Sequence, residues 1–285
     1  MKNINRRKFI TQSGMGLGAA FLALQIPEQF LAANANDMPV GFQTFPIRDI
    51  LAKDFGGTLK MMADKGYKLV EMCSPKGYEN IGYGPLVGMK ASEMKKIIND
   101  SGLTCPSCHF GFGELTDKLD ERIAWSQELG LTQMICSTFW LPKTATLKDY
   151  YSAADKLNIA ADKIKKAGMQ TGFHNHDMEF AMLDGQLIYD ALLNRFDANL
   201  VKLQFQTEVI NNGYKAADYF KKFPGRFISS HLSDWTPEKK EVAVGKGVID
   251  WKEFFNAAKT GGVKNFFVEM NLDKFKDSAD YIHSL

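Results

Sequence analysis

A repeated pattern of a short apolar run followed by a longer amphipathic stretch constrains the fold of this 285-residue chain most strongly. Each unit spans about 30 residues, the usual length of one strand and one helix. A glycine often stands just before an apolar run, where it can end a helix in the left-handed conformation. The pattern predicts eight strands, which begin near Val40, Lys68, Leu103, Thr132, Met169, Leu200, Arg226 and Val263.

The stretches between these runs have the periodicity of surface helices, as at 91–101, 118–129 and 149–167. Eight alternating strand–helix units favour a closed parallel barrel over an open sheet. No Gly-x-Gly-x-x-Gly follows the first expected strand, and no Gly-Lys-Ser/Thr loop is present to hold a phosphate. We therefore expect an α/β protein with a single (β/α)8 TIM barrel over residues 36–285.

The first 35 residues do not follow the repeat. Arg6 and Arg7 stand before a Gly/Ala/Leu run at 14–24, and Ala33-Asn34-Ala35 follows as an A-x-A-like cleavage site. A basic region, an apolar run and small residues in this order are typical of an export signal. The paired arginines indicate a twin-arginine signal over residues 1–35, removed on export to the periplasm. An ordinary secretory signal and an uncleaved anchor are the alternatives.

Charge and cysteine content narrow the class of protein further. Without residues 1–35, the chain has 31 basic and 32 acidic residues, a net charge of −1, which argues against nucleic-acid binding. No membrane association is expected after cleavage of the signal. The four cysteines do not suggest a disulfide framework, and we expect the Cys105-x-x-Cys108 pair to be strand-end thiols without a redox or metal role.

Polar residues stand at the ends of the later apolar runs. His174 and His176 end the run that begins at Met169, and His231 and Glu269 end two later runs. The carboxyl ends of parallel barrel strands meet at one rim, so these side chains converge. Two histidines and a carboxylate can bind a divalent metal with positions left for substrate. Support for His231 is expected from Ser233 or Asp234.

Other residues are expected at the same rim. Glu71 would end the second strand and bind sugar hydroxyls, unless it forms a rim salt bridge. His109 would follow the third strand and contact substrate or transfer a proton. Trp235 is expected to stack on a sugar ring or to cap the barrel, and Lys246 to meet an anionic group or only solvent.

Four segments carry a family resemblance: Gly172–Phe180, His231–Trp235, Val244–Trp251 and Phe267–Met270. They resemble the xylose-isomerase-like barrel superfamily, and within it the sugar phosphate isomerases/epimerases. The resemblance spans essentially all of residues 36–285. It implies one divalent metal (Mn, Zn, Mg or Co) held by a carboxylate on strand five, an Asp on strand six, a His on strand seven and a Glu on strand eight.

This chain matches the family pattern at His231 and Glu269 and departs from it at the other two positions. His174 stands at the position of the strand-five carboxylate, and Gln206 at the position of the strand-six Asp, with Glu208 as a substitute. The resemblance therefore implies a metal set of His174, Gln206, His231 and Glu269. Proton transfer would fall to His176, His174 and Glu269.

The function expected from the resemblance is a metal-dependent isomerase or epimerase. It would act on a sugar or keto-sugar, a small-molecule carbohydrate, through an enediolate-type intermediate. A 3-keto-glycoside lyase or hydratase would use the same proton abstraction. The alternative that is not an enzyme is a non-catalytic sugar-binding barrel. The sequence leaves the oligomeric state open.

Overall fold

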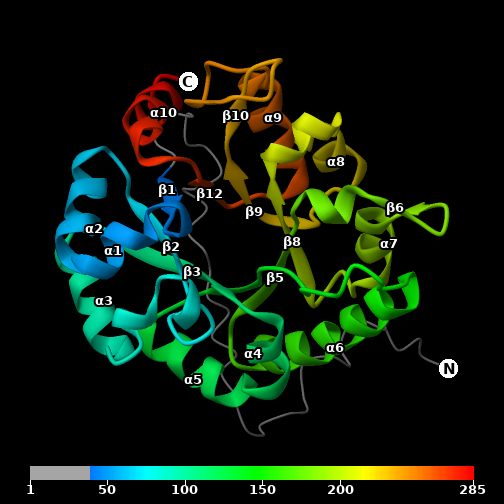
Figure 1. Cartoon of the computed structure of the whole chain (residues 1–285), viewed down its shortest axis with the longest axis horizontal. Coiled ribbons are helices and arrows are strands. Elements are labelled where there is room, and N and C mark those ends of the chain that lie inside the picture. Colours follow the sequence, from blue (N-terminus) through cyan, green and yellow to red (C-terminus); the bar gives the residue numbers. More distant parts are fainter. Residues whose placement is uncertain (1–38) are drawn as a thin grey trace, which may run out of the picture. The chain divides into compact units, whose positions relative to one another are not determined.

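The computed structural model describes residues 39–285, and the expected export signal lies outside the described residues. Eight parallel strands form a closed barrel in the order β1-β12-β9-β8-β5-β4-β3-β2. Figure 1 shows the strands around the centre and the helices outside them. The (β/α)8 prediction is confirmed, and each strand begins within about two residues of its expected position. The barrel strands are β1 (Val40–Gln43), β2 (Leu69–Cys73), β3 (Thr104–Phe110), β4 (Gln133–Cys136), β5 (Gln170–His174), β8 (Val201–Gln206), β9 (Phe227–Leu232) and β12 (Asn265–Val268).

Helices cover the barrel from outside. None of those described is both long and apolar enough to span a membrane. They are α1 (Arg48–Lys53), α2 (Phe55–Asp64), α3 (Ala91–Asp100), α4 (Phe112–Asp117), α5 (Leu119–Leu129), α6 (Leu147–Lys166), α7 (Ile188–Arg195), α8 (Ala216–Lys222), α9 (Trp251–Gly261) and α10 (Phe275–His283).

Short elements follow the carboxyl ends of several barrel strands. Two-stranded hairpins stand after β5 and β9, and 3₁₀ helices occupy most of the other loops. These segments surround the mouth of the barrel, where active sites of this fold are built. They are η3 (Phe45–Ile47), η4 (Glu79–Ile81), η5 (Gly84–Leu86), η6 (Asp177–Phe180), β6 (Met182–Leu183), β7 (Gln186–Leu187), η7 (Thr207–Asn212), β10 (Asp234–Trp235), β11 (Glu241–Val242) and η8 (Leu272–Lys274).

Local sequence explains where the helices begin and end. The Thr146 backbone N–H donates to Asp149 Oδ2 at 2.8 Å and starts α6, and the Glu253 N–H donates to Asp250 Oδ1 at 2.9 Å and starts α9. Each bond satisfies a donor that a free helix end would leave unpaired. Gly130 ends α5 with φ of 93°, in the left-handed region that a glycine adopts without a Cβ clash.

The barrel interior is apolar between strands and helices but polar at its centre. Bulky branched side chains usually fill a TIM barrel. Here Gln43, Glu71, Ser107, Gln204 and Ser229 all lie inside with no exposed surface. Burying such groups costs free energy unless each finds a partner, so their bonding identifies the functional centre of the molecule.

The cysteines correct one expectation. Cys105 and Cys108 lie within β3, not at its carboxyl end, and all four cysteines are free and buried. Burial raises the pKa of the Cys105 thiol to about 12. A buried thiol that stays protonated is a poor nucleophile and metal ligand.

Candidate metal and active site

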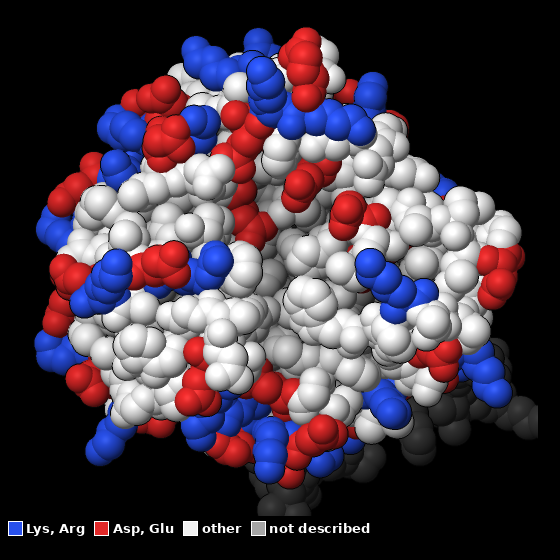
Figure 2. Space-filling model, viewed as in Figure 1, with Lys and Arg blue, Asp and Glu red and all other residues white. Residues whose placement is uncertain are grey.

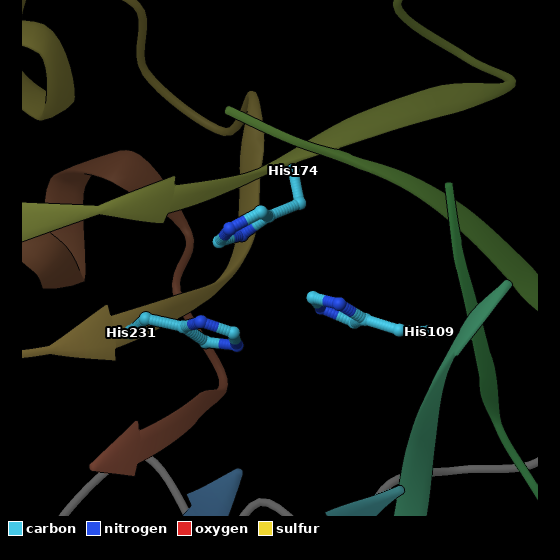
Figure 3. Close-up of side chains that lie close together, drawn as sticks. All are labelled: His109, His174 and His231. Atoms are coloured by element: carbon cyan, nitrogen blue, oxygen red, sulfur yellow. The ribbon is translucent and has the colours of Figure 1, made fainter. Parts of the chain in front are cut away.

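Three histidines from three different strands converge inside the barrel. His109 lies in β3, His174 ends β5 and His231 lies in β9, and each is at most 5% exposed. One ligand atom from each lies within 4.8 Å of the others. Figure 3 shows the three rings pointing toward a common centre. The predicted convergence of His174 and His231 is therefore found, and His109 joins them from within a strand, not from a loop after it.

His231 lies between two carboxylates. Its Nε2 is 2.5 Å from Glu71 Oε2, and its Nδ1 is 2.8 Å from Glu269 Oε2. Burial alone would lower the pKa of His231, but the charges and hydrogen bonds of Glu269 and Glu71 raise it to about 10. Both ring nitrogens therefore carry protons when only these carboxylates face them.

Glu71 is not at the rim, and the expected rim position was wrong. Its carboxylate is fully buried and accepts hydrogen bonds from Gln43 Nε2 at 2.8 Å and from Ser107 Oγ at 2.5 Å. Gln204 Nε2 donates to the same carboxylate at 2.8 Å. Burial opposes its ionisation, yet the neighbouring His109 and His231 lower the pKa of Glu71 overall. With its oxygen atoms occupied, Glu71 has no free acceptor for a sugar hydroxyl.

Gln206 and Glu269 meet on the other side of His231. Gln206 Nε2 donates to Glu269 Oε2 at 2.6 Å, so this oxygen contacts both Gln206 and His231. Burial alone would raise the pKa of Glu269, but the charge of His231 lowers it overall. The four residues predicted as a metal set thus lie at one end of adjoining strands, in the order β5, β8, β9 and β12.

The chemistry of two unpartnered atoms fits a divalent metal. His174 Nδ1 and Gln206 Oε1 are buried, and neither has a hydrogen-bond partner among the described residues. Burial, with the nearby histidines, lowers the pKa of His174 well below its usual value, so its imidazole is neutral. A neutral imidazole and an amide oxygen are both metal ligands. Together with His231 and Glu269 they supply the nitrogen and oxygen donors that a site needs.

An acidic group of side chains lines one side of the barrel mouth. Figure 2 shows a hollow at the centre of this face, with carboxylates beside it. Glu208 lies on η7, and partial desolvation by its neighbours, together with the charges of Glu269 and Asp177, raises its pKa. No hydrogen bond joins Glu208 to the other predicted ligands in the described part of the chain. Of Gln206 and Glu208, Gln206 is therefore the better candidate for the metal ligand on this strand.

His176 stands further out than His174, next to an exposed tryptophan. Its ring lies 4.8 Å from that of His174 and 6.1 Å from that of Trp140, measured between centroids. Trp140 is 64% exposed and has φ of 51°, an uncommon conformation for a side chain of this size. The buried Glu179 accepts from the His176 backbone N–H at 2.7 Å and from Thr138 Oγ1 at 3.1 Å. These contacts fix the turn that carries His176.

Asp234 organises a loop instead of supporting His231, and this expectation is corrected. Its Oδ2 accepts from the Gly245 and Gly247 N–H groups, each at 3.0 Å, and from Trp251 Nε1 at 2.8 Å. A Cβ at Gly247 would lie 2.2 Å from Asp234 Oδ1, which explains the glycine. The segment Val244–Trp251, one of the four that carry the family resemblance, is therefore a loop wrapped around the buried carboxylate of Asp234.

No hydrogen bond joins the two remaining predicted rim residues to the histidines in the part of the chain that the structure describes. Lys246 is exposed in the same loop, and its backbone N–H donates to Ala243. Trp235 is half-buried, and its Nε1 donates to Ser233 Oγ at 3.2 Å. Their proposed roles toward substrate stay predictions.

Comparison with known proteins places this geometry in a family. The family model described as a xylose isomerase-like TIM barrel matches residues 59–285, most of the chain. The chain belongs to this family. No curated protein matches it.

Solved structures resemble this xylose isomerase-like barrel over most of their length. A sugar phosphate isomerase/epimerase from Parabacteroides distasonis is 21% identical, with a TM-score of 0.76 over 89% of this chain and 95% of its own. An L-ribulose 3-epimerase is 15% identical, with a TM-score of 0.65 over 86% and 93%. The IOLI protein with a binding zinc atom is 11% identical, with a TM-score of 0.62 over 87% and 94%. At these identities the likeness establishes the shared fold.

Sequence reasoning gave no role to several residues of this xylose isomerase-like barrel. Gln43, Ser107 and Ser229 belong to the hydrogen-bonded centre, and Gln204 links it to His109 at 2.6 Å. One signal was available, because residues two apart on a strand face the same side, and Gln204 stands two before Gln206. The two serines carry the same signal, because Ser107 stands two residues before His109 and Ser229 two residues before His231.

Proposed function

We propose that this chain is a metal-dependent isomerase or epimerase acting on a sugar or keto-sugar. The observation that carries the proposal is the pair of buried, unpartnered ligand atoms, His174 Nδ1 and Gln206 Oε1, beside His231 and Glu269. These four residues would hold the ion. A divalent metal bound there would supply Lewis-acid polarisation of a sugar carbonyl.

The proton transfer is assigned to His176. Burial lowers the pKa of His176, so its imidazole is neutral and able to accept a proton. It would take the proton from the sugar carbon next to the carbonyl, and the electron pair of that C–H bond would move to the carbonyl oxygen as an enediolate. Return of the proton to the neighbouring carbon, with transfer of the hydroxyl proton to the former carbonyl oxygen, gives an isomer. Protonation of the same carbon by a second donor on its opposite face gives an epimer.

The surrounding residues would orient the reacting groups. Glu179 holds the backbone at His176, and Trp140 offers an apolar face for a sugar ring at the mouth. Glu269 fixes His231 and Gln206 through one oxygen atom. The acidic side of the mouth favours an uncharged carbohydrate over a phosphorylated one, because like charges repel.

The experiment is solvent exchange with purified protein freed of the leader. We would incubate it with Mn²⁺ in D₂O with free ketoses and with keto-glycosides, and follow deuterium beside the carbonyl by NMR. Deuterium in a recovered isomer or epimer supports the proposal. Release of the aglycone indicates a lyase or hydratase instead. Binding without exchange indicates a sugar-binding barrel, and a His231→Gln variant provides the inactive control.

We also propose that the chain is exported to the periplasm by a twin-arginine signal. The support is the order of basic, apolar and small residues within 1–35. Replacing Arg6 and Arg7 together by Lys should leave uncleaved precursor inside the cell. Unchanged export of this double variant would contradict the twin-arginine route.

A further inference from the structure

Glu71 lies at the centre of a hydrogen-bond network that reaches two of the three histidines. Besides the bonds already described from Gln43, Ser107 and Gln204, its Oε2 lies 2.5 Å from His231 Nε2 and 3.2 Å from His109 Nε2. An ionised carboxylate only accepts hydrogen bonds. Every group around it must therefore donate, and this requirement fixes the orientation of each neighbour.

The amide of Gln204 is oriented by this rule. Its Nε2 is the atom that faces Glu71 Oε1 at 2.8 Å, because only an N–H can approach an acceptor so closely, and it also donates to Ser229 Oγ at 2.9 Å. The Oε1 atom of Gln204 must then face His109 Nε2 at 2.6 Å. Since an amide oxygen only accepts, His109 Nε2 carries a proton.

The two nitrogens of His231 face different surroundings. Its Nε2–H is held by a carboxylate that is fully buried and bonded on all sides. Its Nδ1 faces Glu269 and, through it, Gln206, which are both expected metal ligands. Carboxylates that hold the second nitrogen of a ligating histidine commonly fix its tautomer and ring orientation.

Two irregularities in the barrel register build this network. Between Leu69 and Glu71 of β2, the paired strand β3 contains one extra residue, which brings Ser107 opposite Glu71. The pairing of β8 with β9 shifts between Leu203 and Gln204, which brings Ser229 opposite Gln204. Bulges of this kind re-aim side chains and concentrate next to active sites. Both irregularities supply a hydroxyl partner to the Glu71–Gln204 pair.

We propose that Glu71 is a positioning residue for the metal site. With Gln204 it holds Nε2–H of both His231 and His109, so that each ring can offer a metal only its Nδ1, and the Nδ1 of His231 is the one that lies beside the expected ligands Glu269 and Gln206. A centre made of His109, His174 and His231 is the competing arrangement, since their nitrogens lie within 4.8 Å. The inference rests on the proposed function for the presence of a metal, but its tautomer assignment does not.

The first test reads the tautomer directly. Long-range ¹H–¹⁵N correlation spectra of the metal-free protein would be assigned with single His→Gln variants, which is practical because the chain has five histidines. We expect His109 to be protonated at Nε2. A His109 that carries its proton only at Nδ1 would overturn the proposal, whether or not the protein binds a metal.

The second test measures affinity for Zn²⁺ and Mn²⁺ by calorimetry. Glu71→Gln should weaken binding by about 10- to 100-fold, whereas Glu253→Gln, the same change outside the barrel on α9, should leave it unchanged. His109→Gln should keep wild-type affinity, and His231→Gln should lose it. Equal losses in His109→Gln and His231→Gln would support the three-histidine centre and overturn the proposal.

These measurements separate failure of the inference from failure of the proposed function. If the wild-type protein binds neither metal, the proposed function fails, and the spectra still decide the tautomer of His109. If Glu71→Gln does not fold, as judged by circular dichroism, the His109→Gln affinity and the wild-type spectra decide the ligand set. Wild-type affinity in a folded Glu71→Gln variant would remove the positioning role.

Discussion

Glu71 Oε2 and His231 Nε2 lie 2.5 Å apart in the barrel interior, although 160 residues separate them in the sequence. Both side chains are fully buried, so each would lose a charged partner inside the barrel without the other. A buried pair of this kind adds little stability compared with apolar residues, yet loss of one member is costly. We therefore interpret the pair as a requirement of the site and not of the fold.

This relationship predicts non-additive stability effects. Glu71→Gln and His231→Gln should each destabilise the protein, but the double variant should cost less than the two single costs combined. We expect a coupling free energy of about 1–3 kcal/mol. Urea denaturation of the four proteins in the absence of metal measures it, and strictly additive changes would contradict a direct pair.

Asp234 should matter for loop stability far more than a surface aspartate. Asp234→Asn would turn an N–H₂ group toward the backbone and indole donors around the carboxylate, at a cost of roughly 2–4 kcal/mol. Asp250→Asn should change the free energy of unfolding by less than about 0.5 kcal/mol, because asparagine also caps helices well. Thermal denaturation compares the two. A similar stability for both variants would contradict the assigned role of Asp234.

The order of elements could be predicted from the sequence because periodicity and glycine punctuation are local signals. The convergence of His174, His231 and Glu269 followed from the rule that parallel strand ends meet at one rim. The hydrogen bond between Glu71 and Ser107 could not be predicted, since it depends on the register shift between β2 and β3. The role of Asp234 was also out of reach, because its partners are backbone groups that fold back from 245–249.

Glu179 should make stability depend on pH. Burial raises the pKa of Glu179 from 4.5 to about 7, so the folded state binds a proton that the unfolded state has released. Protonation of Glu179 therefore contributes about 3 kcal/mol to the free energy of unfolding below pH 4.5, and this contribution is lost as the pH rises to 7. Glu179→Gln should lack this dependence. Urea denaturation at intervals across this range gives the difference, and parallel curves for both proteins would contradict the shift.

Trp140 should contribute to substrate binding without contributing to the fold. Its side chain is 64% exposed beside His176, so Trp140→Ala removes contact area from the mouth and little from the core. We expect KM to rise about 3- to 10-fold with kcat almost unchanged. Ile159→Ala is the matched control, because Ile159 is 69% exposed on α6. An unchanged KM in Trp140→Ala would place the sugar elsewhere.

Substitutions of His174 and of His176 should impair the protein in different ways. His174 has a buried unpartnered Nδ1 and a ring 4.5 Å from that of His231, so His174→Gln should lose metal and activity together. His174→Glu restores the carboxylate that the family resemblance places on strand five, and it should retain metal. His176→Gln should keep about one metal ion per chain but lose turnover and deuterium exchange, since removal of a general base typically costs about 10²–10⁴-fold in rate. Elemental analysis and exchange rates on the same preparations separate the two roles. Wild-type exchange in His176→Gln would transfer the proton step to another group, and His109, whose ring lies 4.9 Å from that of His174, is the next residue to test.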